Sequence, residues 1–198
     1  MKHIYREPDN GPDAWIEVDG GGLAGLVIDG LGSVRYRVTF RGPGGHSWGA
    51  FGLANPAHAV SRAVRHFQDL ADTLTRSGPR TSYNVGRIGG GASVNAIPAE
   101  SWMEVDMRSV SPESLARIET VFLEAMDRAL AEENALRRDG PPLTVEKARI
   151  GDRPSGEGDR SAPLIQRASP PRRCSACRGD WHARRPIPTC PSRSACRP

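Results

Sequence analysis

Four side chains suited to catalysis or ligand binding lie beside glycines or at strand ends, and His46 is the most distinctive. His46 lies in the loop RGPGGHSWGAFG, residues 41–52, directly after a strand pattern. An imidazole can donate a hydrogen bond to charge that develops on a reacting oxygen, and the neighbouring glycines permit close backbone approach. From the sequence alone, a solvated or structural loop histidine is an equally good interpretation.

The other three candidates are Asp19, Asn95 and Arg108. Asp19 follows a short strand pattern and precedes three glycines, so its carboxylate could reach a site at a sheet edge, although aspartates that start turns are common there. Asn95 comes just before Ile97-Pro98 and has a turn interpretation as well. The Arg108 guanidinium could bind a substrate carboxylate with two hydrogen bonds, or could pair with Asp106 or Glu104 on the surface.

These residues need strands to position them, and alternation of apolar and polar residues predicts such strands. A short strand is expected at residues 14–19, and residues 34–41 alternate without a fault. Further strands are expected at 81–91, 101–110 and 143–151. In the first long strand the predicted buried face consists of Val34, Tyr36, Val38 and Phe40.

Two helices are expected between these strands. Asn55-Pro56 and Ser111-Pro112 each combine a favoured N-cap with a proline at the first helical position, and apolar residues then recur at helical spacing until Ser77 and Gly140. The resulting order over residues 34–151 is β-α-β-β-α-β. This order predicts an α+β, ferredoxin-like fold with a four-stranded antiparallel sheet and both helices on one face.

Composition excludes some classes of function. The net charge of +4 comes from arginines crowded into the last thirty residues, so it is weak support for nucleic-acid binding. No apolar run approaches the roughly 20 residues that a membrane span needs. The N-terminus has no apolar segment typical of a signal peptide, which indicates a cytoplasmic protein.

The segment 169–198 differs from the rest of the chain. It lacks periodicity, is rich in Arg, Pro and Ser, and holds the four cysteines of the protein. Cys174, Cys177, His182, Cys190 and Cys196 could form a zinc knuckle, but their spacing is not distinctive. A frameshift in GC-rich DNA is the preferred interpretation, because such an error yields this residue mixture.

Several motifs in order resemble one enzyme family. They are VDGGG at 18–22, GGHS at 44–47, NAIP at 95–98 and DMRS at 106–109. Together they resemble the dinuclear zinc exopeptidase and aminoacylase family, which includes peptidase T, acetylornithine deacetylase, succinyl-diaminopimelate desuccinylase and carboxypeptidase G. The resemblance covers roughly residues 14–167, and it implies a ferredoxin-like lid that is inserted into a zinc-binding catalytic domain and dimerises.

The resemblance also implies roles for the four residues. His46 would stabilise the oxyanion of amide hydrolysis, often in the active site of the dimer partner. Asn95 and Arg108 would bind substrate, and Asp19 would be a zinc ligand. The implied domains are a catalytic remnant at 1–33, the lid at 34–151, a return segment at 152–168 and the tail at 169–198.

We therefore expect a fragment of a zinc-dependent peptidase or amidohydrolase, a homodimer that cleaves small peptides or N-acyl amino acids. The remaining zinc ligands of the family are missing from the sequence, so we expect this chain alone to be inactive and to hold no zinc. A non-catalytic homodimerisation module is the main alternative, and a zinc-knuckle nucleic-acid binder built on the tail is another. Two zinc ions per chain would favour the intact enzyme, one bound through cysteines would favour the knuckle, and none would favour the bare module.

Overall fold

The computed structural model describes residues 16, 26–156 and 158–168, and the chain divides into two compact units. One unit is Asp29–Glu157, and the other comprises Met1–Ile28 and Gly158–Pro198. In the second unit, the described residues contain one helix, α3 (Pro163–Ala168). The strand expected at 14–19 and the tail at 169–198 lie outside the described residues, Ile16 excepted. None of the described helices is long and apolar enough to cross a membrane.

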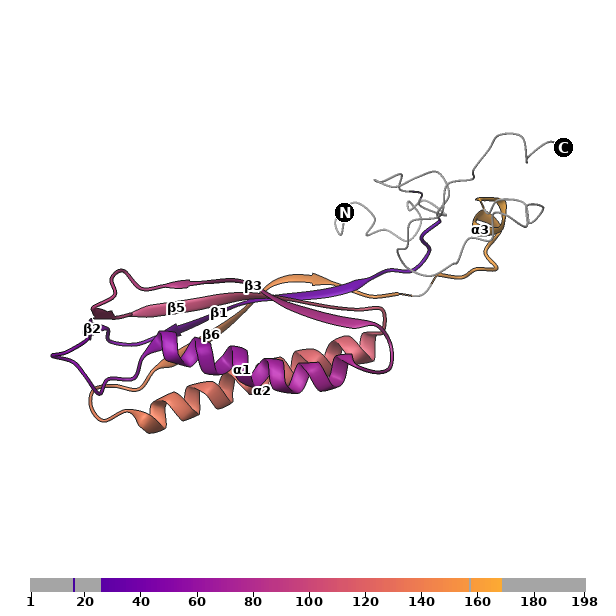
Figure 1. Ribbon diagram of the computed structural model, residues 1–198. Coiled ribbons are helices and arrows are strands. Elements are labelled where there is room, and N and C mark those ends of the chain that lie inside the picture. Colours follow the sequence, from indigo (N-terminus) through magenta and orange to yellow (C-terminus); the bar gives the residue numbers. More distant parts are fainter. Residues whose placement is uncertain (1–15, 17–25, 157, 169–198) are drawn as a thin grey trace, which may run out of the picture. The chain divides into compact units, whose positions relative to one another are not determined.

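The larger unit is a four-stranded antiparallel sheet covered on one face by two long helices (Figure 1). The order across the sheet is β3-β5-β1-β6. This arrangement confirms the ferredoxin-like fold that the order of elements predicts. The bounds are β1 (Gly32–Arg41), α1 (Pro56–Thr75), β3 (Thr81–Gly90), β5 (Glu100–Ser109), α2 (Pro112–Leu136) and β6 (Thr144–Arg153).

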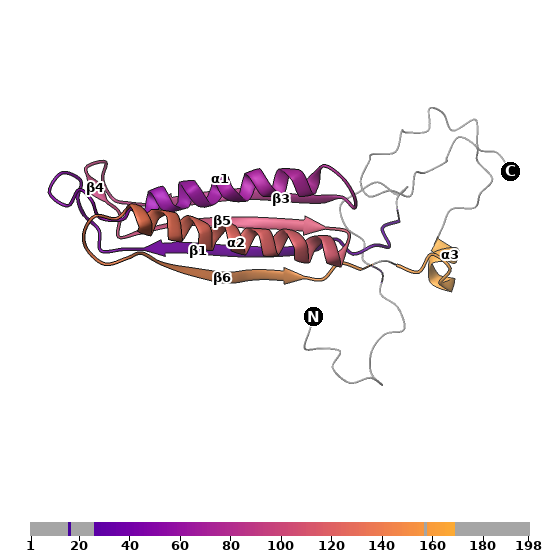
Figure 2. The same ribbon diagram turned by 90° about the horizontal axis from the view of Figure 1, so that it is seen from below.

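The core lies between the sheet and the helices, because alternate residues of each inner strand point toward them. On β1 the buried residues are the predicted Val34, Tyr36, Val38 and Phe40, and on β5 they are Met103, Val105 and Met107. Phe67 of α1 and Phe122 of α2 are fully buried, with ring centroids 5.1 Å apart. Figure 2, which views the unit from the helix side, shows α1 and α2 running side by side along the sheet.

Both helices begin where the sequence predicts. The Asn55 side-chain oxygen accepts a hydrogen bond from the backbone N–H of Ala57 at 2.9 Å, and the Ser111 hydroxyl accepts from that of Ser114 at 3.2 Å. Each cap satisfies an N–H group that the first helical turn leaves without a partner. The Asn55 cap therefore fixes where the chain leaves the loop at 42–55 and enters α1.

The outer face of the sheet carries ion pairs in register. Arg37 and Arg87 both donate to Glu104, at 2.8 and 2.9 Å, and the Arg37 guanidinium stacks 3.9 Å from the Trp102 ring centroid. Two further arginines of β1 lie on either side of Arg37. Arg35 donates to Asp106 at 2.9 Å, and Arg41 donates to Glu100 and Glu146. Because carboxylates and guanidiniums alternate, this face has no large region of one charge.

Two short features complete the unit. β2 (Gly45–His46) and β4 (Ala96–Ile97) form a separate two-stranded pairing that joins the loop at 42–55 to the loop at 91–99. At the opposite end of the sheet, the N–H of Gly30 donates to the Gly156 oxygen at 2.6 Å and the N–H of Gly156 donates back at 3.0 Å. The chain thus enters this unit beside Gly30 and leaves it beside Gly156, and these two residues are hydrogen-bonded to each other.

Candidate functional site

His46 lies in β2, in an exposed loop whose hydrogen bonds define the state of its ring. Its Nδ1 atom accepts from the backbone N–H groups of Trp48 and Gly49 at 3.3 and 3.4 Å. Since an acceptor nitrogen of a neutral imidazole carries no proton, the proton lies on Nε2. The Nε2–H group is therefore the donor that His46 offers to a ligand.

Asn95 lies beside His46, one residue before β4. The Ser47 backbone N–H donates to the Asn95 backbone oxygen at 2.9 Å, and His46 is paired with Ala96. The Ser93 hydroxyl donates a short hydrogen bond to Oδ1 of Asn95. With Oδ1 engaged in this way, the side-chain NH₂ of Asn95 is the group that remains to bind a ligand.

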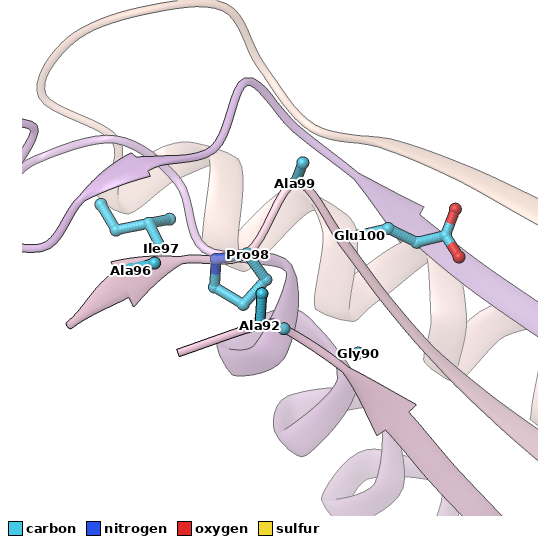
Figure 3. A pocket seen from close by; sticks show the side chains of 8 residues that line it. Gly90, Ala92, Ala96, Ile97, Pro98, Ala99 and Glu100 are labelled. Carbon is cyan, nitrogen blue, oxygen red and sulfur yellow. The ribbon is translucent and has the colours of Figure 1, made fainter. Parts of the chain in front are cut away.

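A shallow pocket opens beside this pair, inside the loop that joins β3 to β5 (Figure 3). Its volume is about 340 Å³, and small apolar side chains line most of it. The one charged group in its wall is Glu100, whose carboxylate points away from Ala92 and Pro98 in Figure 3 and accepts from Arg41 at 3.0 Å. The pocket has room for a small apolar group and offers no acid or base of its own.

Arg108 lies near the other end of β5, where it pairs with Ser33 of β1 and Ser82 of β3. Its Nε donates to Oδ2 of Asp106 at 2.6 Å, and Asp106 also accepts from Arg35. Burial raises the pKa of Asp106, but the two guanidiniums outweigh it and leave that pKa below its usual value. Asp106 is thus an ionised partner that fixes the orientation of Arg108.

The structure therefore brings His46 and Asn95 together and leaves Arg108 apart. Glu100 and Arg108 are eight positions apart on an extended strand, roughly 26 Å at about 3.3 Å per residue. The His46–Asn95 pair lies beyond Glu100. A single small peptide or acylated amino acid cannot span this length. One copy of the lid cannot present all three side chains to one such substrate.

Asp19, the expected zinc ligand, lies outside the described residues. Among the residues that the structure does describe, no group of three or more His, Cys, Asp or Glu side chains could hold a metal ion. A dinuclear zinc centre does not fit the described residues.

Two groups beside the candidate site were not anticipated from the sequence. Ser93 orients the Asn95 amide, and Glu133 of α2 binds the end of the His46 loop at the backbone of Asn55. The Ser93–Asn95 contact is local, since it joins side chains two positions apart. The Glu133 contact joins positions 78 residues apart and leaves no local signal.

Comparison with known proteins identifies the family of this chain. The sequence profile of the peptidase dimerisation domain of M20-type enzymes matches residues 31–134, slightly more than half of the chain. The chain therefore belongs to this peptidase dimerisation domain family, and the family resemblance drawn from its motifs is confirmed. No curated protein sequence matches the chain significantly.

Solved structures with the same fold include enzymes that act on amides and peptides. An amidase of the hydantoinase/carbamoylase family from Burkholderia vietnamiensis is 22% identical, with a TM-score of 0.54 over 67% of this chain and 30% of that chain. AtUAH in complex with (S)-hydroxyglycine is 17% identical, with a TM-score of 0.58 over 69% and 31%. Aminopeptidase PepT from Bacillus cereus is 17% identical, with a TM-score of 0.55 over 75% and 37%. The chain spans about a third of the length of these proteins.

Proposed function

We propose that this chain contains the lid of a zinc-dependent amide hydrolase that acts on small peptides or N-acyl amino acids. In this proposal His46 and Asn95 stabilise the oxyanion that forms at the scissile carbonyl, and Arg108 binds the substrate carboxylate. Asp19 is the proposed carboxylate ligand of the metal centre. Zinc bound at such a centre would supply activation of water for attack on the amide carbonyl.

The observation that carries the proposal is the hydrogen bonding of the His46–Asn95 pair. The acceptor atom of each side chain, Nδ1 of His46 and Oδ1 of Asn95, is already occupied by a neighbour in its own loop. Both side chains therefore offer N–H donors outward. Fixed donors of this kind are what an oxyanion site requires, because they stabilise negative charge without having to reorganise during the reaction.

The separation of the pair from Arg108 supports composite active sites in a homodimer. Arg108 lies at the end of the sheet where the chain enters and leaves the unit, and His46 and Asn95 lie at the far end. We infer that Arg108 serves the site of its own chain, whereas His46 and Asn95 reach the site of the partner chain. Each active site then receives all three groups although no single lid could supply them.

The edge strand β3 is the proposed seam of this dimer. Exposed sheet edges are normally protected by charged side chains. Of the two edge strands, β6 carries five charged residues, whereas β3 carries one, Arg87. Ile88 on β3 is moreover 61% exposed. These features favour pairing of β3 with the same strand of a second copy.

A chimeric enzyme tests the catalytic proposal. Residues 30–156 of this chain would replace the matched segment of the Burkholderia vietnamiensis amidase. We expect the chimera to hydrolyse its amide substrate, and His46→Gln to lower kcat by a factor of about 10²–10³ because an oxyanion donor is weakened. The matched control is His66→Gln, a change at a histidine of α1 that binds Glu132 of α2.

Mixing two chimera variants tests the composite site. His46→Gln and Arg108→Ala chimeras should each be nearly inactive, but a mixed heterodimer would hold one site with all three groups. Random exchange of subunits should restore about a quarter of the full activity, since half of the dimers are mixed and each has one intact site. Unchanged activity in the His46→Gln chimera would refute the oxyanion role, and no recovery on mixing would refute the composite arrangement.

A non-catalytic homodimerisation module remains the second candidate, favoured by the match to a dimerisation domain. Under this alternative the full chain dimerises, but His46→Gln has no effect on hydrolysis in the chimera. The same chimera therefore discriminates between the two functions.

A further inference from the structure

We propose that Glu133 is the positioning residue that holds the His46 loop in its donor geometry. The proposal rests on the proposed role of His46, but it concerns a different residue, one that touches no reacting group. Glu133 lies on α2, is 4% exposed, and is the one carboxylate among the buried residues of the described chain.

The carboxylate of Glu133 bridges α2 to the beginning of α1. Oε1 accepts from the backbone N–H of Asn55 at 3.0 Å, and Oε2 accepts from Nε of Arg62 at 3.0 Å. The ring of His58 approaches Oε1 at 3.7 Å. A buried carboxylate is costly unless it is paired and hydrogen-bonded, and these contacts compensate its burial.

This contact completes a capping box between two different helices. In the usual form, a glutamate at the third helical position accepts from the N–H of the N-cap residue. Here the N-cap is Asn55 and the third position is His58, which has no carboxylate. Glu133 supplies the missing acceptor from α2, and its negative charge lies at the positive end of the α1 dipole.

Backbone hydrogen bonds organise most of the segment between His46 and this cap. The Ala50 N–H donates to the His46 oxygen at 2.8 Å, and the Leu53 N–H donates to the Ala50 oxygen at 3.2 Å. These two turns span residues 46–53, which end two positions before Asn55. The Arg138 N–H, just beyond α2, donates to the Gly52 oxygen at 2.8 Å and ties the same segment to the same helix. Loss of the Glu133 contact releases the Asn55 end of this segment from α2, while the bond from Arg138 to Gly52 remains.

Nuclear magnetic resonance on the full chain tests the proposal. Glu133→Gln keeps the shape of the side chain but removes its charge, and Glu133→Leu removes the acceptor altogether. The matched control is Glu132→Gln, since Glu132 is the preceding residue on α2 and binds His66 and Arg128 but not the loop. The measurements are the ¹⁵N signals of the His46 ring and the exchange of the Trp48 and Gly49 amide hydrogens.

We expect amide exchange at Trp48 and Gly49 to be about threefold faster in Glu133→Gln and about tenfold faster in Glu133→Leu, as the loss of one net hydrogen bond predicts. The His46 ring signals should move toward an average of the two tautomers. The Val38 amide, in the sheet core, should keep its exchange rate, which separates loop release from general destabilisation. Glu132→Gln should leave the loop within about twofold of the wild type.

Unchanged His46 signals and loop exchange in Glu133→Gln would overturn the proposal, even if Glu133→Leu failed to fold. An equal effect of Glu132→Gln would overturn it as well. None of these measurements depends on catalysis. If His46→Gln leaves the chimera active, the proposed function fails. The effect of Glu133 on the His46 ring is then still decided by the nuclear magnetic resonance measurements alone.

Discussion

Tyr36 shows how one residue of the core couples this fold to pH. Its ring packs against Phe122 with centroids 5.3 Å apart, and its hydroxyl donates to Glu119 of α2 at 2.6 Å. Burial, together with the hydrogen bond and the charge of Glu119, raises the pKa of Tyr36 to about 12. Burial and Asp72 raise the pKa of Tyr83 to about 12 in the same way.

These pKa values predict alkaline destabilisation. A phenol with a folded-state pKa above its unfolded value of 10.0 stabilises the fold fully below pH 10 and loses that contribution as the pH rises toward 12. We expect the free energy of unfolding to fall across this window. Tyr36→Phe should reduce the loss by roughly 1–2 kcal/mol.

Urea unfolding at several values between pH 8 and pH 12 measures this effect. Tyr5→Phe is the control, since Tyr5 does not belong to Asp29–Glu157, the unit that contains the sheet. An identical pH dependence in Tyr36→Phe and the wild type would contradict the interpretation.

At the candidate site, the sequence indicated His46 and Asn95 as candidates but not the residues that orient them. His46 and Asn95 are conspicuous because glycines and a proline surround them, and the prediction of a strand before each loop is confirmed. Their roles remain predictions. The pairing of β2 with β4 joins residues fifty positions apart, and no local pattern encodes such a contact.

Among the elements, the contact between β3 and β5 depends on the absence of a side chain. The Trp102 indole lies over Gly89, and a Cβ atom at that position would come within 2.6 Å of the ring. The indole is in turn stacked by Arg37. A glycine here lets β3 pair closely with β5 while the indole stays flat against the outer face of the sheet.

Gly89→Ala should therefore destabilise the unit by about 1–3 kcal/mol, because the added methyl group clashes with the indole. Gly49→Ala is the matched control, since a Cβ atom added at Gly49 would meet nothing within 4 Å beyond its chain neighbours. Chemical denaturation monitored by circular dichroism measures both variants. Equal stability of Gly89→Ala and the wild type would show that Trp102 does not rest on β3.

The elements themselves were largely predictable, and the reason is physical. A half-buried strand and an amphipathic helix each repeat their pattern over many residues, so β1, β5, α1 and α2 are visible in the sequence. The Glu133 bridge was not visible for the opposite reason. It depends on how two helices lie against each other, and α2 carries adjacent glutamates that look alike in the sequence.

At the scale of the whole molecule, the proposed homodimer pairs one edge of the sheet, β3, and leaves the other edge, β6, unpaired. Ile88→Lys on β3 should weaken dimerisation at least tenfold, because a lysine on an exposed edge opposes pairing with another strand. Ile150→Lys on β6 is the control, since Ile150 is similarly exposed, at 53% against 61% for Ile88.

Sedimentation equilibrium of the full chain gives the dissociation constants for this comparison. A wild-type chain that stays monomeric at high concentration would remove the basis of the composite site. A larger effect of Ile150→Lys than of Ile88→Lys would move the seam to β6.

The reciprocal hydrogen bonds between Gly30 and Gly156 also have a practical consequence. Since Gly30 and Gly156 are adjacent in space, the two ends of the 30–156 segment already meet. Protein engineers could excise it, close it with a short linker and reopen it at an exposed turn such as Gly78, with little change in the chain path. A unit whose entry and exit points are adjacent can be inserted into another protein without separating the two ends of the host chain at the insertion point.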